Sequence, residues 1–432
     1  MLTHTATARV PVAADEIDVG EWFFGLSDRD YAATARHHLG AGTSGDGGRR
    51  RFFDAEGFPG VVIVNHHVEE EARRDYVRVR SRDSSARLLG VLPVPLDVSV
   101  EIGVRPVGDA EAELECRLHL GLPRGLEWLA RVLGAKGRQR RHNAEQTRGF
   151  ADDIEAKAYR ARTIRLSAGD IRVRERGEGD PIVFIHGVFM NGDTWREVVP
   201  RLAGRHRCIV PDWPTGGHRI ALSPDARPSP PLLAELVVEL LDALEVERAT
   251  LVGIGLGTVL CEMVAIEHPE RVDRVVFGSG DILSTFPPRW ARLRFASAFL
   301  PPTALLAALL FRIPAVRRNT YRMFAHEVDD RIAESFTRGV RTDAGVRRDA
   351  MRLLRAIFVG RTGVQHERLR AFDRPALVAW GADDIAFPES HPDDLAALLR
   401  DVRVERIAGA RTFLGQDQPE AFADSIARFA EA

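Results

Sequence analysis

The pattern of apolar and polar positions changes near residue 158 of this 432-residue chain. Before that point, apolar and polar residues alternate along successive short segments, which predicts antiparallel strands with one face exposed to water. After it, short continuous apolar runs alternate with amphipathic stretches, which predicts buried parallel strands covered by helices. We therefore expect two domains, an α+β domain over residues 1–157 and an α/β domain over residues 158–432.

The elements predicted for the first domain follow a definite order. A short strand at 8–12 precedes a helical region at 14–38 and a glycine-rich loop at 40–48, and after Pro123 a long helix runs to residue 157. The strands between them carry alternating apolar residues, namely Tyr76, Val77, Val79, Val98, Val100, Ile102, Val104, Leu114, Cys116, Leu118 and Leu120. A basic cluster on the long helix indicates a solvated face, with binding of an anion or a partner as the alternative. The cluster consists of Arg138, Arg140, Arg141 and His142.

This order resembles the helix-grip fold of START-like domains, the SRPBCC superfamily that includes polyketide aromatases and cyclases and lipid carriers. The resemblance rests on architecture and covers residues 1–157. It implies a cavity between a curved antiparallel sheet and the long helix, which would suit a hydrophobic small molecule. A space filled by ordinary core side chains is the alternative.

Seven apolar runs of the second domain predict strands separated by helices. In such α/β sheets ligands bind at the carboxyl ends of the strands, so we expect the site there. The runs are 171–175, 182–185, 208–210, 249–252, 272–277, 376–380 and 402–407. Residues 251–258, Leu-Val-Gly-Ile-Gly-Leu-Gly-Thr, join one strand directly to an apolar helix. This is the frame of a nucleophile elbow, G-x-S-x-G, whose middle residue projects over the edge of the sheet. Gly255 occupies the middle place, so the frame lacks a nucleophile.

Four motifs, in their order along the chain, resemble those of the α/β-hydrolase superfamily, in particular its haloalkane dehalogenase and epoxide hydrolase branch. They are the His-Gly turn within 184–188, Pro-Asp-Trp at 211–213, the elbow at 253–257 and Trp-Gly-Ala-Asp-Asp at 380–384. Helical sequence at 282–370 resembles the cap that roofs the pocket in this branch. The resemblance implies an oxyanion hole formed by the backbone N–H groups of Val188 and Leu256. It also implies a triad acid at Asp384.

Two of the three residues that a hydrolytic triad needs are absent. Gly255 replaces the Ser or Asp nucleophile, and Thr412 stands where the family places its histidine base. A neutral hydroxyl is a negligible proton acceptor at neutral pH. Asp384 is left with an electrostatic role or a purely structural one, and Asp281 lies where some members of the branch place a relocated acid. His218 is the candidate replacement base, with a surface loop histidine as the alternative.

The loops after the strands supply further candidates for substrate binding. They are His186, Phe189, Asn191 and Trp213, joined by Trp290 of the cap sequence. A structural role in the His-Gly turn is the alternative for the histidine, and an ordinary place in the core is the alternative for the aromatic residues.

The composition of the chain argues against several classes of function. The formal net charge is −2, from 60 basic and 62 acidic residues, which gives no electrostatic argument for binding nucleic acid. Cys116, Cys208 and Cys261 fit neither a disulfide framework nor a zinc motif, so we expect reduced core residues, no metal and no cofactor. We expect neither a secretion signal nor a membrane span, which favours a cytoplasmic protein. Homodimer formation is left open.

The missing nucleophile and base favour a protein that binds a hydrophobic small molecule, such as a lipid, a terpenoid or a polyketide, without triad hydrolysis. The alternative is a non-hydrolytic enzyme, a cyclase, lyase or hydratase, that polarises a carbonyl through the oxyanion hole. In that enzyme Asp384, Asp281 or His218 would move protons. A hydrolase with a non-standard nucleophile is the third hypothesis.

Overall fold

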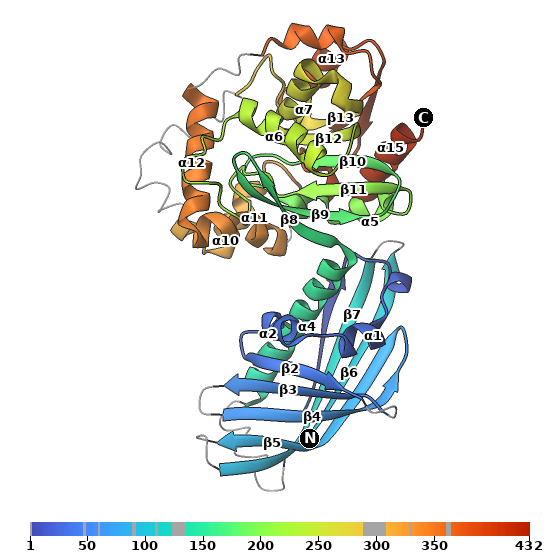
Figure 1. The fold of residues 1–432 in the computed structure, drawn as a ribbon, viewed down its shortest axis with the longest axis vertical. Helices are drawn as coiled ribbons and strands as arrows, with labels where there is room; N and C mark the ends of the chain where they lie inside the picture. The colour runs from blue at the N-terminus through green and yellow to red at the C-terminus, as the bar shows by residue number, and fades with distance from the viewer. Residues whose placement is uncertain are drawn as a thin grey trace. The chain divides into compact units, whose positions relative to one another are not determined.

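The structure is a computed structural model that describes most of the chain. The described residues are 2–45, 49–58, 61–88, 92–108, 111–122, 135–287, 308–328, 330–359 and 364–432. They form two compact units, Met1–Tyr159 and Arg160–Ala432, drawn in Figure 1.

The first unit is built on a seven-stranded antiparallel sheet with the strand order β1-β7-β6-β5-β4-β3-β2. Its strands are β1 (Leu2–Val10), β2 (His38–Ser44), β3 (Arg51–Phe58), β4 (Val61–Ala72), β5 (Tyr76–Leu88), β6 (Leu92–Gly108) and β7 (Glu111–Gly121). Its helices are η1 (Ala14–Glu16), α1 (Val19–Phe24), α2 (Asp28–Thr34) and α4 (Ala135–Ala158). Helix α4 lies along the sheet and packs on β1, β7 and α2 (Figure 1). It contributes Phe150, Ala151 and Ile154 to the apolar core of the unit.

The prediction of a loop at residues 40–48 is wrong for residues 40–44, because these residues belong to β2, which pairs with β3. Two glycines weaken strand propensity, and this led to the prediction of a loop. In the structure Gly40 leaves room for the Asp28 carboxylate, since a β-carbon at Gly40 would lie 2.1 Å from Asp28 Oδ1. Asp28 Oδ1 accepts a hydrogen bond from the N–H of Ala41 at 3.0 Å. The glycine therefore serves contact between α2 and this edge strand.

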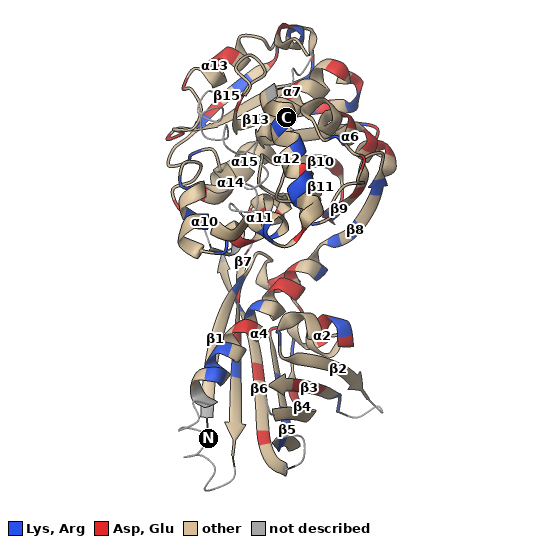
Figure 2. Ribbon diagram, turned by 90° about the vertical axis from the view of Figure 1, so that its left-hand side faces the viewer, with Lys and Arg blue, Asp and Glu red and all other residues tan. Residues whose placement is uncertain are grey.

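The basic cluster of α4 is solvated only in part. Arg138, Arg140 and Arg141 are exposed, whereas His142 is 5% exposed and faces the interior of the unit. In Figure 2 basic residues gather near the beginning of α4 and acidic residues nearer its end. The prediction of a solvated face is thus wrong for His142. Successive residues of a helix point in different directions, so His142 can face the sheet although Arg141 faces water.

The second unit contains an eight-stranded sheet in the order β15-β14-β13-β12-β10-β11-β9-β8. Its strands are β8 (Arg160–Leu166), β9 (Gly169–Arg176), β10 (Asp180–Ile185), β11 (His206–Pro211), β12 (Ala249–Gly255), β13 (Val272–Gly280), β14 (Ala376–Gly381) and β15 (Val402–Ile407). The six strands from β10 onward run parallel, and β9 joins β11 and β8 in antiparallel pairs. The α/β prediction for this half of the chain is confirmed.

Helices cover both faces of this sheet. They include α5 (Val199–Leu202), α6 (Pro230–Ala243), α7 (Leu256–Glu267), α13 (His391–Ala396), α14 (Leu414–Asp417) and α15 (Pro419–Ala430). Val183 and Ile185 of β10 pack in the cluster that contains α6 and α7. Phe184 points to the opposite face, where its ring lies 4.9 Å from the ring of Trp195. Burial of both faces explains why these strands are continuous apolar runs.

The helices expected at 282–370 lie between β13 and β14. The described ones are α10 (Pro314–Tyr321), α11 (Asp330–Thr342), α12 (Ala344–Val359) and η5 (His366–Ala371). Helices α10, α11 and α12 lie together on one side of the unit (Figure 1). Throughout the described part of the chain, no helix combines the length and apolar character that crossing a membrane requires.

Candidate functional site

The turn from β12 to α7 has the backbone of a nucleophile elbow. Gly255 ends the strand at φ 60° and ψ −122°, and α7 begins at the next residue. A β-carbon at Gly257 would lie 1.9 Å from the carbonyl oxygen of Ile185, and one at Gly253 would lie 2.4 Å from the carbonyl oxygen of Gly257. These two glycines are therefore required by backbone packing. At Gly255 a β-carbon would lie 3.3 Å from the Cα of Gly187, which is a tight contact, and the positive φ would strain any side chain placed there.

The His-Gly turn after β10 faces the same point as the start of α7. A β-carbon at Gly187 would lie 3.5 Å from the backbone nitrogen of Leu256. As the first residue of α7, Leu256 presents an N–H group that has no partner within the helix, at the positive end of the helix dipole. The following residue of the turn is fixed, because Phe189 N–H donates to Thr215 and Tyr321 Oη donates to the Phe189 carbonyl oxygen. Hydrogen bonds thus position the residue that follows Val188, whose N–H group is proposed for the oxyanion hole with that of Leu256.

Thr412, which the sequence analysis placed at the position of the base, binds Asp384. Its Oγ1 donates to Asp384 Oδ2 at 2.8 Å, and the N–H groups of Ala386 and Phe387 donate to Asp384 Oδ1. Burial raises the pKa of Asp384, although these hydrogen bonds oppose the shift. Thr412 itself is 1% exposed. The threonine therefore gives Asp384 a hydrogen-bond donor, and its neutral hydroxyl is a negligible proton acceptor at neutral pH.

Asp281 lies beside the elbow and leads to a histidine that the sequence analysis missed. Gly280 of β13 pairs with Gly255, and Asp281 follows it. Thr285 Oγ1 donates to Asp281 Oδ1 at 2.6 Å and lies 3.1 Å from His391 Nε2. His391 is 1% exposed, and burial lowers its pKa. No motif marks this histidine, because it begins α13, far along the chain from Asp281.

Glu262 of α7 is a second buried carboxyl near the elbow. It is 1% exposed, and its Oε1 accepts a hydrogen bond from the N–H of Leu283 at 3.0 Å. Burial raises the pKa of Glu262 well above its ordinary value, and the charge of Asp281 acts in the same direction. An apolar helix pattern gave no reason to single this residue out.

His218 is buried, which corrects the alternative of a surface histidine. It is 1% exposed, its Nδ1 accepts from the N–H of Gly216, and its Nε2 lies 3.5 Å from Asp349 Oδ2 of α12. The carbonyl oxygen of His218 also packs on α11, 2.4 Å from where a β-carbon at Gly339 would lie. The helices inserted after β13 cover this loop, and their contacts were invisible in the local sequence.

The other candidates lie in the same loops and are held by neighbouring groups. His186 is fully buried, its Nε2 accepts from the N–H of Trp213, and burial lowers its pKa to about 4. Trp213 is also fully buried, and its indole N–H donates to the Phe184 carbonyl oxygen. Asn191 donates to Gly217 and to Ser335 of α11. Phe189 packs on the inserted helices. Trp290 lies outside the described residues.

An ion-pair network that the sequence analysis did not identify fixes these loops. Arg219 binds Asp212 at 2.6 Å and also pairs with Asp193, and Arg174 binds Asp193 at 2.7 Å. Ser335 of α11 donates a hydrogen bond to Asp193. The arginine charges lower the pKa values of both carboxyls, against the effect of burial. The network ties the loop after β10 to the inserted helices.

Substitution of Gly257 tests whether backbone packing requires the elbow glycines. We expect Gly257→Ala to lower the free energy of unfolding by about 3 kcal/mol or more, because the new methyl group meets a carbonyl oxygen that cannot move aside. Gly204→Ala is the matched control, since a β-carbon there meets nothing within 4 Å, and it should change stability by less than about 0.5 kcal/mol. Urea unfolding measures both, and equal effects would contradict the packing argument.

Glu262→Gln tests the protonation of the buried carboxyl. A raised pKa means that the folded protein holds a proton that the unfolded chain releases, so the carboxyl lowers stability as pH rises above its ordinary pKa. The variant should match the wild-type protein in acid and be more stable at neutral pH, by about 1.4 kcal/mol for each unit of pKa shift. Urea unfolding across pH, with the exposed Glu389→Gln as control, checks this. A variant less stable at neutral pH would show that Glu262 is ionised.

Comparison with known proteins agrees with this geometry. The sequence profile of the alpha/beta hydrolase fold matches residues 180–415. Haloalkane dehalogenase 2 of Mycobacterium tuberculosis is 24% identical over 291 residues, which cover 64% of this chain and 97% of the dehalogenase. The 2-hydroxymuconate semialdehyde hydrolase of Pseudomonas sp. strain CF600 is 37% identical over 119 residues, which cover 27% of this chain and 41% of the hydrolase.

A solved structure supports the same fold. The crystal structure of Cfl2 from Burkholderia cenocepacia superposes with a TM-score of 0.55 at 22% identity, covering 63% of this chain and 96% of Cfl2. The profile spans more than half of the 432 residues, and the structure supplies the sheet and elbow that the profile implies. The chain therefore belongs to the alpha/beta hydrolase fold family.

Proposed function

We propose that the second unit binds a hydrophobic small molecule and does not hydrolyse it with a serine or aspartate nucleophile. One observation carries this proposal: the elbow keeps its catalytic backbone at φ 60° and ψ −122° while the projecting residue is Gly255. The base position agrees, because Thr412 donates its only hydroxyl proton to Asp384. Covalent triad catalysis needs both groups, and the two losses occur together.

We further propose that the ligand has an apolar body and one polar end. Partly buried apolar side chains pack on the core cluster that includes Leu256, and they come from the His-Gly turn, the segment after β13 and the inserted helices. They include Val188, Leu283, Phe286, Met323, Phe324 and Phe358. The N–H groups of Val188 and Leu256 would hold a carbonyl or carboxylate oxygen. A lipid, a terpenoid or a polyketide has this combination of groups.

For the first unit we propose a START-like helix-grip domain. Its antiparallel sheet and the long helix α4 support this assignment. The side chains between sheet and helix, among them Phe52, Phe150 and Leu114, form a packed core. A hollow of about 540 Å³ between β1 and α4 has polar or glycine lining, at Thr3, His4, Gly137 and Arg140. We therefore assign the hydrophobic ligand to the second unit.

A non-hydrolytic enzyme is the second candidate, and the group around Asp281 favours it. Asp281, Thr285 and His391 form a linked set beside the strand pair that ends at Gly255. Such a set could move a proton to or from a substrate that the N–H pair polarises, as a lyase, hydratase or cyclase requires. Asp384 and His218 remain alternative proton carriers, each bonded to a neighbour.

Rebuilding the triad tests the proposal directly. A fluorophosphonate probe should leave the wild-type protein unlabelled, because no activated serine is present. Gly255→Ser with Thr412→His should label, and Gly255→Ser alone should label at least about 100-fold more slowly, since a general base contributes this much. Gly255→Ala with Thr412→His is the control, because it adds the same β-carbon without the hydroxyl. Labelling of the wild-type protein that one serine substitution abolishes would refute the proposal.

Extraction of bound small molecules separates a carrier from an enzyme. We expect native mass spectrometry of the full chain, purified from its own host, to show a co-purifying hydrophobic metabolite, and Gly255→Trp to reduce its occupancy by filling the elbow. Gly204→Trp, at an exposed glycine, is the control. An unchanged ligand mass after incubation supports binding alone. A changed mass that Asp281→Asn, Asp384→Asn or His218→Ala prevents would favour the enzyme. A protein free of ligand would contradict both.

A further inference from the structure

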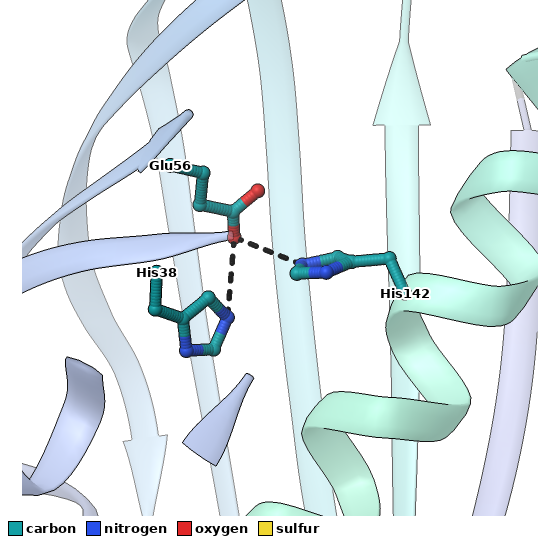
Figure 3. Close-up of side chains that lie close together, drawn as sticks. All are labelled: His38, Glu56 and His142. Atoms are coloured by element: carbon teal, nitrogen blue, oxygen red, sulfur yellow. Dashed lines mark ion pairs between the residues drawn. The ribbon is translucent and has the colours of Figure 1, made fainter. Parts of the chain in front are cut away.

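Three buried side chains of the first unit converge on one point. His38 begins β2, and Glu56 lies directly opposite it on β3, because the strand register pairs these two residues. His142 reaches the same point from α4 (Figure 3). Glu56 Oε1 lies 3.3 Å from His142 Nε2 and 3.8 Å from His38 Nε2. The three atoms all lie within 4.8 Å of one another.

Both histidines are buried and turn an unbonded nitrogen toward this point. His38 is 6% exposed and His142 is 5% exposed. Neither His38 Nε2 nor His142 Nε2 has a hydrogen-bond partner in the described structure. A buried polar atom without a partner costs free energy, so a structure that keeps two of them at one point needs an explanation.

The surroundings of His38 fix which nitrogen carries its proton. His38 Nδ1 lies 3.0 Å from the carbonyl oxygen of Tyr31 and 2.8 Å from Thr34 Oγ1. A carbonyl oxygen only accepts, so Nδ1 must be the donor. The neutral ring then presents its Nε2 lone pair toward Glu56. Metal-binding histidines are commonly oriented in this way, by a second nitrogen that donates to a carbonyl oxygen.

Glu56 is oriented by its neighbours as well. Tyr31 Oη lies 3.3 Å from Glu56 Oε1 and donates to Asp54 Oδ2 at 3.1 Å. The ring of Tyr31 also stacks on His38, with centroids 4.0 Å apart. One tyrosine therefore packs on one imidazole and places its hydroxyl beside the carboxylate of Glu56. A proton on His142 Nε2 would pair it with Glu56 but would leave His38 Nε2 without a partner, whereas a cation between the three ligand atoms would give each of them a partner.

We propose that His38, Glu56 and His142 bind one divalent transition-metal ion, with Zn²⁺ as the ion that suits the donor set. Two imidazole nitrogens and one carboxylate oxygen are a known ligand combination for zinc. With bonds of 2.0–2.1 Å, the ligand atoms of a tetrahedral zinc site lie about 3.4 Å apart, close to the 3.3 Å and 3.8 Å that separate Glu56 Oε1 from the two imidazole nitrogens. Three protein ligands leave a fourth position for water or for an oxygen atom of a ligand.

This site differs from the sequence expectation that the chain holds no metal. The three ligands come from a strand start, a neighbouring strand and a helix, at positions 38, 56 and 142, and they form no spacing motif. Only the sheet register and the docking of α4 bring them together. The site lies in the first unit, and it holds or fails independently of the function proposed for the second.

Metal titration of the full chain tests the proposal. After chelator treatment and dialysis, calorimetry with Zn²⁺ should show one saturable site per chain, and mass spectrometry of the metal content should agree. His142→Gln and Glu56→Gln should each weaken binding about 100-fold or more, because each removes a direct ligand. His66→Gln is the control, since this histidine lies exposed on β4 and should leave binding unchanged.

Co²⁺ in place of Zn²⁺ gives a test on the wild-type protein alone, so its result does not depend on variants that fold. The wild-type protein loaded with one equivalent of Co²⁺ should show the visible absorption of a four- or five-coordinate ion with nitrogen and oxygen ligands. A wild-type protein with no stoichiometric site, or a Co²⁺ spectrum like that of the hydrated ion, would overturn the proposal. Binding that persists unchanged in a folded His38→Gln and His142→Gln double variant would overturn it too.

Discussion

The second unit depends on how closely backbone segments approach one another at the elbow. Gly257 lets α7 lie against the carbonyl oxygen of Ile185 in β10, and Gly280 lets β13 lie against Gly255. A backbone atom cannot turn aside as a side-chain end can, so these contacts tolerate no β-carbon. The same contacts fix the direction in which position 255 projects, whichever residue stands there. The elbow is thus a packing feature first and a catalytic feature second.

Because packing alone fixes the elbow, the fold can keep its form with glycine at position 255. Glycine adopts a positive φ without the strain that a nucleophile at the elbow must bear, so its presence at 255 removes a cost. At the base position Thr412 is small and buried, and it satisfies the Asp384 carboxylate by a hydrogen bond at 2.8 Å. With Ala386 and Phe387, Thr412 gives both carboxylate oxygens of Asp384 a hydrogen-bond partner. Under the proposed function, the N–H groups beside Gly255 would bind an oxygen atom of a ligand without cleaving a bond.

The positions of buried polar groups away from the elbow depend on tertiary contacts between distant parts of the chain. His218 meets Asp349 of α12, Asp281 is linked to His391 through Thr285, and in the first unit His142 meets Glu56. Each pair joins elements that are distant in the chain. Buried charges and imidazoles need such partners, and the sequence around each residue does not reveal them. Helix pattern or loop position alone marked His142 and His218 as solvated or as surface residues, and both are buried.

By itself the sequence indicated seven of the eight strands of the second unit and the elbow with Gly255 in its middle, whereas β8 was missed. These features are encoded in short segments of the sequence. Continuous apolar runs indicate strands buried on both faces of a sheet, and closely spaced glycines indicate close approach of backbone segments. It also indicated the antiparallel strands and long helix of the first unit. Only the tertiary structure decided that residues 38–44 form a strand, that His391 stands near Asp281, and that His38, Glu56 and His142 share one point. The reason is physical, since those contacts depend on strand register and helix docking, which no single segment encodes.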